Sequence, residues 1–189
     1  GKTIYNGLSY RLNSWALMND KLHLDFGVFD FKTRECMIEA AGYFDLSEEY
    51  FRKGCHTLST IRTSDNQYLL VELSGKSMNL NPIDFIGGIM ETNFAMERSE
   101  DVFDSFYEEL HEEACIQKSD IELWYLALIY LNANTNIGFY FEVVLNITAA
   151  TLLQRFRETS KDQDIKALRV FSRNQYLVIL ASLNCNILF

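Results

Sequence analysis

The segment from Gly87 to Ile116 restricts the fold most, because it sets two glycines ahead of an acidic amphipathic helix. We predict a helix from about Ser99 to Ala114, with Ser99 as its N-cap and acidic residues in the first turn, where the helix dipole favours them. Its apolar positions recur with a helical period and form one core-facing stripe: Val102, Phe103, Phe106 and Leu110. The stripe predicts that the helix packs on a second layer, which strand-like segments on both sides supply.

These flanking segments predict a mixed sheet. The first fifty residues are rich in strand-like segments, including FKTRECMIE, with a hairpin turn at Asn19-Asp20 and a short helix at Leu46 to Arg52. Two strands, CHTLSTIRT and QYLLVEL, and a short strand, IDFIGG, precede the acidic helix. Beyond it we expect, in order, IELWYLALIYL and IGFYFEVVL as strands, TAATLLQRFRE as a helix capped by Thr148, KALRVFS as a strand, and NQYLVILASL, whose periodicity leaves its helical form open.

This order predicts the α+β class, an α/β/α sandwich with a mixed sheet between helices. We expect residues 1–50 to form a β-rich N-terminal extension and residues 51–189 to form the main domain. With 48% hydrophobic and 14% aromatic residues, the chain is expected to build an ordered core.

Charge and composition narrow the partners. The net charge of −9 argues against binding to a nucleic-acid backbone, which calls for a basic face. No apolar run approaches the roughly 20 residues that span a bilayer, and the first residues lack a signal-peptide core, so we expect no membrane contact and a cytoplasmic location. The four cysteines show no metal-site spacing and are expected to be reduced thiols, with disulfides or a metal site as the alternatives.

Three glutamates carry the clearest functional signal. Glu109, Glu112 and Glu113 stand at i, i+3 and i+4, so they lie on one helix face and repel one another. A solvated charged face is one explanation. A bound cation is the other, and clustered carboxylate oxygens suit Mg²⁺ or Mn²⁺ acting on a phosphate substrate.

The same residues resemble the Nudix hydrolase box, G-x5-E-x7-R-E-U-x-E-E-x-G-U, in which U is aliphatic. Glu100 stands at the spacing of the first glutamate, the run Glu109-Leu110-His111-Glu112-Glu113 matches E-U-x-E-E, and Ile116 takes the last aliphatic position. Glu108 replaces the family arginine, and Cys115 replaces the family glycine, which permits a left-handed conformation that cysteine does not easily adopt. The resemblance implies a Nudix fold for residues 51–189.

A second resemblance, in the N-terminal region, points to the Nudix branch that cleaves UDP-sugars. In that branch an Asn-Gly-x-x-(Phe/Tyr)-Arg-Leu segment precedes a Leu-x-Leu-x-x-Gly strand. The matching residues here are Asn6, Gly7, Tyr10, Arg11, Leu12, Leu22, Leu24 and Gly27. The resemblance implies that the N-terminal segment forms part of the sugar or base pocket, and it allows for a homodimer.

Together the resemblances imply hydrolysis of a nucleoside diphosphate linked to another moiety, such as UDP-glucose cleaved to UMP and glucose 1-phosphate. Glu109, Glu112 and Glu113 would be the catalytic metal ligands, and one of them or a loop carboxylate would activate the water. Two alternatives stay open: a Nudix hydrolase acting on ADP-ribose or another nucleotide, and a nucleotide-binding module that has lost catalysis, which the replacements at Glu108 and Cys115 suggest.

Other residues are expected to bind the substrate or support the site. The Gly87-Gly88 turn would let the backbone approach the diphosphate and present N–H groups to it. Basic residues expected to hold the substrate are Arg11, Arg62 and Lys76. Glu100 would support the helix start and the metal shell, whereas Glu142 would be either an extra ligand or base, or a solvent-facing residue.

Overall fold

The computed structural model describes residues 6–34, 36–37, 54–74, 82–92, 96–131, 136–160 and 162–182. Strands β1 (Leu8–Met18) and β2 (Lys21–Asp30) pair as an antiparallel hairpin that forms a sheet of its own. The predicted turn is confirmed, since Asn19 and Asp20 take φ values of 51° and 59°, the left-handed pair that a tight hairpin requires.

The segment after β2 differs from the prediction. Residues 31–34 and 36–37 are helical, so the β-strand expected at FKTRECMIE is wrong. The local reason is Asp30, whose carboxylate accepts a hydrogen bond from the backbone N–H of Thr33 at 2.8 Å, as an N-cap does. The short helix expected at Leu46 to Arg52 lies outside the described residues.

The main sheet is mixed, as predicted. Its strands run in the order β5-β4-β3-β7-β6, and β8 also pairs with β4. β3 and β7 are parallel, and the other pairs are antiparallel. The strand bounds are β3 (Cys55–Arg62), β4 (Tyr68–Leu73), β5 (Ile83–Asp84), β6 (Ile121–Leu131), β7 (Ile137–Leu145) and β8 (Ile165–Phe171).

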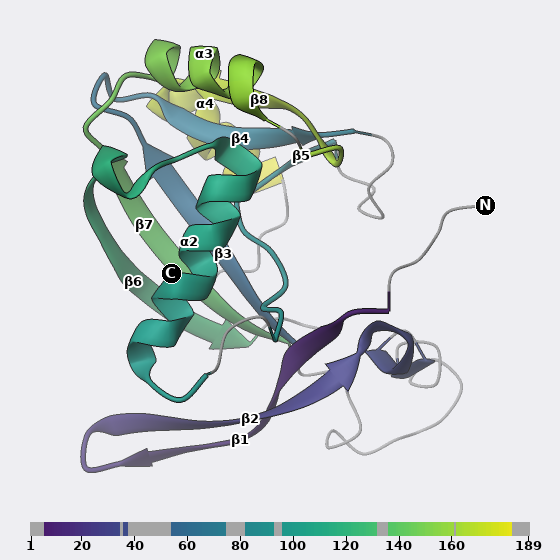
Figure 1. The fold of residues 1–189 in the computed structure, drawn as a ribbon. Helices are drawn as coiled ribbons and strands as arrows, with labels where there is room; N and C mark the ends of the chain where they lie inside the picture. The colour runs from purple at the N-terminus through teal and green to yellow at the C-terminus, as the bar shows by residue number, and fades with distance from the viewer. Residues whose placement is uncertain are drawn as a thin grey trace.

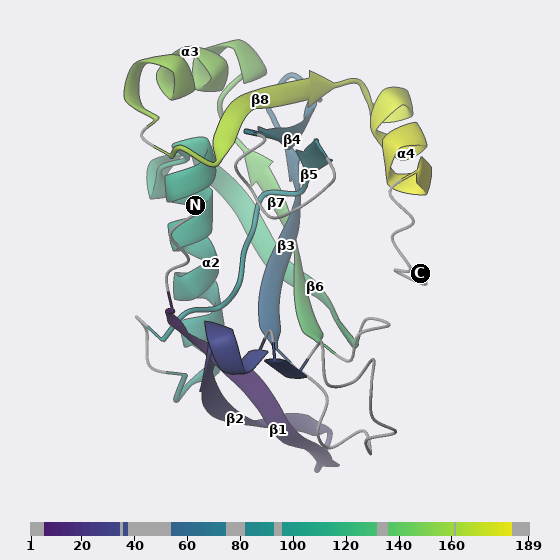
Figure 2. The ribbon, with the colours of Figure 1, turned by 90° about the vertical axis from the view of Figure 1, so that its right-hand side faces the viewer.

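Helices lie on both sides of this sheet, which confirms the predicted α+β class. The long helix α2 (Ser99–Ala114) crosses one face, α4 (Arg173–Ser182) lies on the opposite side, and α3 (Ala149–Thr159) lies beside β8 (Figures 1 and 2). None of the helices in the described part of the chain is long and apolar enough to cross a membrane.

The helix caps follow local hydrogen bonds. Thr148 caps α3 as predicted, because its side chain accepts from the N–H of Thr151. The predicted Ser99 cap of α2 is wrong, and Arg98 is the cap residue. The carboxylate of Asp101 accepts from the backbone N–H groups of Glu97 and Arg98, at 2.9 and 2.8 Å, and so secures the turn one residue earlier.

Aromatic packing fixes how α2 is rotated on the sheet. The ring of Phe106 stacks on that of Phe141 in β7, with centroids 4.1 Å apart, and Phe103 meets Phe141 and Trp124 edge-on. Leu110 is fully buried on the same stripe. Because these contacts hold the stripe against the sheet, they also set the direction in which the neighbouring glutamates point.

Candidate metal and phosphate site

The two glycines lie between α2 and the sheet. The segment around them runs along the free side of β3, where the N–H of Thr57 donates to the carbonyl of Gly88 at 2.8 Å and the N–H of Met90 donates to the carbonyl of Cys55 at 3.0 Å. At Gly87 the backbone takes φ +143°, and a Cβ there would come within 2.4 Å of the Thr57 carbonyl oxygen. This position therefore requires glycine on both steric and conformational grounds.

Each glycine contacts one glutamate of the triplet. The backbone N–H of Gly87 donates to Oε2 of Glu113 at 2.9 Å. A Cβ on Gly88 would lie 2.6 Å from Oε1 and 2.7 Å from Oε2 of Glu109, so that carboxylate occupies the space a side chain would take. The pair is thus the floor against which two carboxylates pack.

Because the glycines contact only two of the three glutamates, the three differ in exposure. Their spacing places all three glutamates on one helix face, but Glu109 and Glu113 are half-buried, and only Glu112 is exposed. The reason is the glycine segment itself, since a backbone without side chains can lie close to the helix and cover two of its glutamates.

Burial changes the protonation of the covered pair. The pKa of Glu109 is raised to about 7, mainly by desolvation and secondly by the negative charge of Glu112. Desolvation also raises the pKa of Glu113 to about 8, against the opposing effect of the Gly87 N–H bond. Among the described residues, no lysine or arginine forms an ion pair with either carboxylate. Within the described part of the chain, both carboxyls therefore lack a compensating positive charge.

Carboxylates from distant segments of the chain also raise the pKa values of Glu109 and Glu113. The charge of Asp162, in the loop between α3 and β8, raises the pKa of both Glu109 and Glu113. Glu91 acts on Glu109, and Asp84 acts on Glu113. Our sequence reasoning missed these three residues, because no local motif marks them, and only the chain path brings them to the helix.

The donor chemistry fits a hard divalent cation. Carboxylate oxygens are the preferred ligands of Mg²⁺ and Mn²⁺, and two half-buried carboxyls with raised pKa values gain most when a cation replaces their protons. In the part of the chain that the structure describes, no three His, Cys, Asp or Glu side chains are grouped closely enough to hold a metal ion. The glutamates are therefore suitable donors that are not gathered into a complete ligand set.

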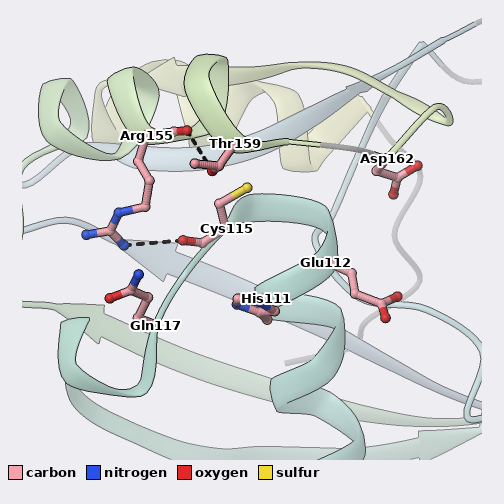
Figure 3. A pocket seen from close by; sticks show the side chains of 7 residues that line it. All are labelled: His111, Glu112, Cys115, Gln117, Arg155, Thr159 and Asp162. Atoms are coloured by element: carbon pink, nitrogen blue, oxygen red, sulfur yellow. Dashed lines mark hydrogen bonds between the residues drawn. The ribbon is translucent and has the colours of Figure 1, made fainter.

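Glu112 opens onto a hollow of about 690 Å³ at the end of α2. Figure 3 shows its lining: His111 and Glu112 come from α2, Cys115 is the C-cap of that helix, Arg155 and Thr159 come from α3, Asp162 from the following loop, and Gln117 from the segment after α2. Glu112 and Asp162 lie on the same side of this hollow (Figure 3). Of the three glutamates, Glu112 is the one that lines this hollow.

The far side of the hollow is built around Arg155. Its guanidinium pairs with the buried carboxylate of Asp120 and donates to the carbonyl of Cys115 at 3.2 Å. Cys115 ends α2 in the left-handed conformation, with φ 55° and ψ 29°, so cysteine does adopt the backbone for which the family uses glycine. Arg155 thereby ties α3 to the turn that ends the glutamate helix.

Several predicted site residues lie elsewhere. Glu100 is exposed in the first turn of α2, nine residues from Glu109 and so about 13 Å along the helix axis. Arg62 donates to the side chain of Asn66 at 2.8 Å and, with Glu142, lines a groove beside α4. Glu142 there accepts a hydrogen bond from Tyr125.

Two further basic candidates are Arg11 and Lys76. Arg11 lies in β1, opposite Gly27 of β2, and its Nε is buried without a hydrogen-bond partner among the described residues. Lys76 lies outside the described residues. Of the predicted site residues, the structure brings Gly87 and Gly88 into contact with Glu113 and Glu109, and it turns Glu112 toward the hollow.

Comparisons with known proteins give similarity in structure only. No family model and no curated protein matches the chain. The NUDIX domain of Shewanella oneidensis NrtR complexed with ADP ribose is 10% identical, with a TM-score of 0.49 over 75% of this chain and 86% of that one. A NUDIX hydrolase from Nitrosomonas europaea is 16% identical, with a TM-score of 0.42 over 68% and 78%. A bifunctional NMN adenylyltransferase/ADP ribose pyrophosphatase from Francisella tularensis is 13% identical, with a TM-score of 0.45 over 80% and 46%.

Proposed function

We propose that this chain is a Nudix-type pyrophosphohydrolase that uses Mg²⁺ or Mn²⁺ to cleave the diphosphate of a nucleoside diphosphate linked to another moiety. One observation carries the proposal: Glu109 and Glu113 pack on the backbone of Gly87 and Gly88 without a cationic side chain among the described residues, while Glu112 faces an open hollow. Covering two carboxylates without a positive charge does not stabilise a helix that serves the fold alone. A bound cation would stabilise both carboxylates.

In this proposal Glu109, Glu112 and Glu113 hold the cation, which neutralises phosphate oxygens when bound. Gly87 keeps Glu113 oriented by its 2.9 Å hydrogen bond, and Gly88 leaves room for Glu109. The hollow admits the diphosphate in line with the attacking water.

Asp162 lines the same hollow, so we assign it the role of accepting the water proton, in place of the loop carboxylate that the sequence left unnamed. A bond forms between the water oxygen and one phosphorus, and the bridging P–O bond breaks. The displaced phosphate leaves as a phosphomonoester.

For the substrate, we propose a UDP-sugar, because residues 6–27 match the Nudix branch that cleaves UDP-sugars.

The hairpin that carries this match has exposed apolar side chains near its tip: Trp15 at 60%, Leu17 at 67% and Met18 at 51% exposure. A two-stranded hairpin is marginal by itself, and exposed apolar patches mark interaction surfaces. We therefore propose this tip as the contact of the expected homodimer, which light scattering on a Leu17→Lys variant tests.

The deciding experiment is a cleavage assay with UDP-glucose, UDP-galactose, ADP-ribose and nucleoside triphosphates, each with Mg²⁺ or with EDTA. UMP release that requires Mg²⁺ supports the full proposal. Glu112→Gln and Glu113→Gln should each reduce the rate by about 10²-fold or more, equivalent to at least about 2.7 kcal/mol of barrier. Glu100→Gln is the matched control, because this exposed glutamate lies on the same helix away from the site.

The other outcomes separate the alternatives. Preferred cleavage of ADP-ribose keeps the hydrolase and replaces its substrate. Nucleotide binding that requires Mg²⁺ but gives no product identifies a binding module. Neither binding nor turnover with any of these nucleotides overturns the proposal.

A further inference from the structure

A second hollow adjoins the carboxylate site. It has a volume of about 460 Å³ and lies between the C-terminal half of α3 and strand β8. Its apolar floor includes Phe156 and Leu168, both buried. Asp162 lines this groove as well as the hollow beside Glu112, so one residue forms the boundary between the two.

The groove carries the opposite charge to the site next to it. Three cationic side chains line it: Arg157 from α3, and Lys166 and Arg169 from β8. This concentration is unusual in a chain with a net charge of −9. An acidic protein that gathers three cations into one hollow offers a local attraction for anions.

One carboxylate already forms ion pairs with two of these cationic side chains. Glu72 of β4 forms ion pairs with both Lys166 and Arg169. Hydrogen bonds from these two side chains lower the pKa of Glu72, so it carries its negative charge at neutral pH. Two positive charges share one negative charge, and Arg157 has no ion-pair partner among the described residues. Asp162 adds a second negative charge, so three positive charges face two negative ones among the described residues, and the groove keeps a small excess of positive charge.

We infer that the α3–β8 groove is an anion subsite for a phosphomonoester dianion, bound by Arg157, Lys166 and Arg169. The identity of the natural ligand rests on the proposed function, since diphosphate hydrolysis leaves two phosphomonoesters beside Asp162. The cation site holds one product, and the groove receives the other. Arginine and lysine donors match phosphate oxygens, and the dianion gains more from three cations than an uncharged sugar does.

Binding can be measured without turnover. Glucose 1-phosphate and inorganic phosphate are titrated into the full chain in EDTA, with isothermal calorimetry or phosphorus NMR as the readout. We expect saturable binding that weakens with added salt and strengthens as the pH rises past about 6, where the second phosphate proton is lost. Dimethyl phosphate, a monoanion, should bind at least fivefold more weakly.

Variants test the residues. Arg157→Gln and Lys166→Gln should each weaken phosphate binding about five- to tenfold, the loss expected for one charge-assisted hydrogen bond at an exposed site. Lys32→Gln is the matched control, because this exposed lysine lies just after β2, away from α3 and β8. Glu72→Gln should strengthen binding, since it frees Lys166 and Arg169 from their competitor, an effect that loss of structure would not produce.

Two results would overturn the inference. One is the absence of saturable phosphate binding in EDTA by the folded protein. The other is binding that Glu112→Gln/Glu113→Gln abolishes while Arg157→Gln and Lys166→Gln leave it intact. Failure of the cleavage assay alone overturns only the proposed function, because the groove is probed without metal or substrate.

Discussion

The backbone N–H of Gly87 donates a 2.9 Å hydrogen bond to the carboxylate of Glu113, across 26 positions of sequence. This bond joins the glycine segment to the acidic helix, and it orients one carboxylate of the candidate metal site. The neighbouring contact, between Gly88 and Glu109, is steric rather than hydrogen-bonded. The two glycines therefore have separable roles, which mutations can distinguish.

Alanine at these two positions should give different phenotypes. Gly87→Ala forces a Cβ to within 2.4 Å of a backbone carbonyl at φ +143°, so we expect it to destabilise the protein by about 2 kcal/mol or more. Gly88→Ala meets only the end of the flexible Glu109 side chain. It should cost less than about 1 kcal/mol in stability and yet weaken Mn²⁺ binding at least tenfold, because Glu109 must move. Urea denaturation and calorimetric Mn²⁺ titration measure the two effects, and equal destabilisation would refute the separation.

The metal-free protein should lose stability as the pH rises. The carboxyls of Glu109 and Glu113 have folded-state pKa values of about 7 and about 8, above their ordinary value of 4.5. Between these limits the folded state holds protons that the unfolded chain has released, so the free energy of unfolding falls from about pH 4.5 to about pH 8. Below that window both states are protonated, and the contribution is fully present.

Thermal melts in EDTA at several pH values check this dependence. Glu113→Gln should flatten the profile, since its amide does not titrate. Added Mg²⁺ should restore stability at pH 8 and have little effect at pH 5, because the ligands must be deprotonated to bind metal. A metal-free protein that becomes more stable between pH 5 and 8 would contradict the prediction.

Removing Arg155 should destabilise the protein strongly. Arg155→Met leaves Asp120 buried without its ion-pair partner, and breaking a buried pair in this way costs about 3–5 kcal/mol. The double variant with Asp120→Asn should recover part of that loss, because the uncompensated charge is gone. Chemical denaturation of the two single variants and the double variant gives the coupling energy. A coupling near zero would show that the pair contributes nothing beyond its separate residues.

The left-handed turn at Cys115 allows a direct test of strain. Cys115→Gly and Cys115→Ala remove the same thiol, but only glycine adopts φ 55° without cost. The glycine variant should therefore be more stable than the alanine variant by about 1 kcal/mol. At Ala114, within the helix, glycine should instead be less stable than alanine by about 0.5–1 kcal/mol. Paired denaturation curves measure both differences, and the same sign at both positions would contradict the assignment.

The sequence by itself determined the α+β class, the long strands β3, β6 and β7, the helix Ser99–Ala114 and the Thr148 cap, because these depend on periodicity and local hydrogen bonds. Its failures were also local: Asp30 begins a helical turn where a strand was expected, and Asp101 moves the cap of α2 from Ser99 to Arg98. In both cases the hydrogen bonds of a single carboxylate to backbone N–H groups stabilise one of several backbone conformations of similar energy.

Only the tertiary structure decided how the site is arranged. Sequence spacing placed Glu109, Glu112 and Glu113 on one face, but the glycine segment covers two of them in part and leaves the third exposed. Asp162 joined them from a loop about fifty residues away, and the basic groove of α3 and β8 formed on its other side. Burial and charge proximity depend on distances between segments that are far apart in the chain, and these distances exist only once the helix has packed against the sheet.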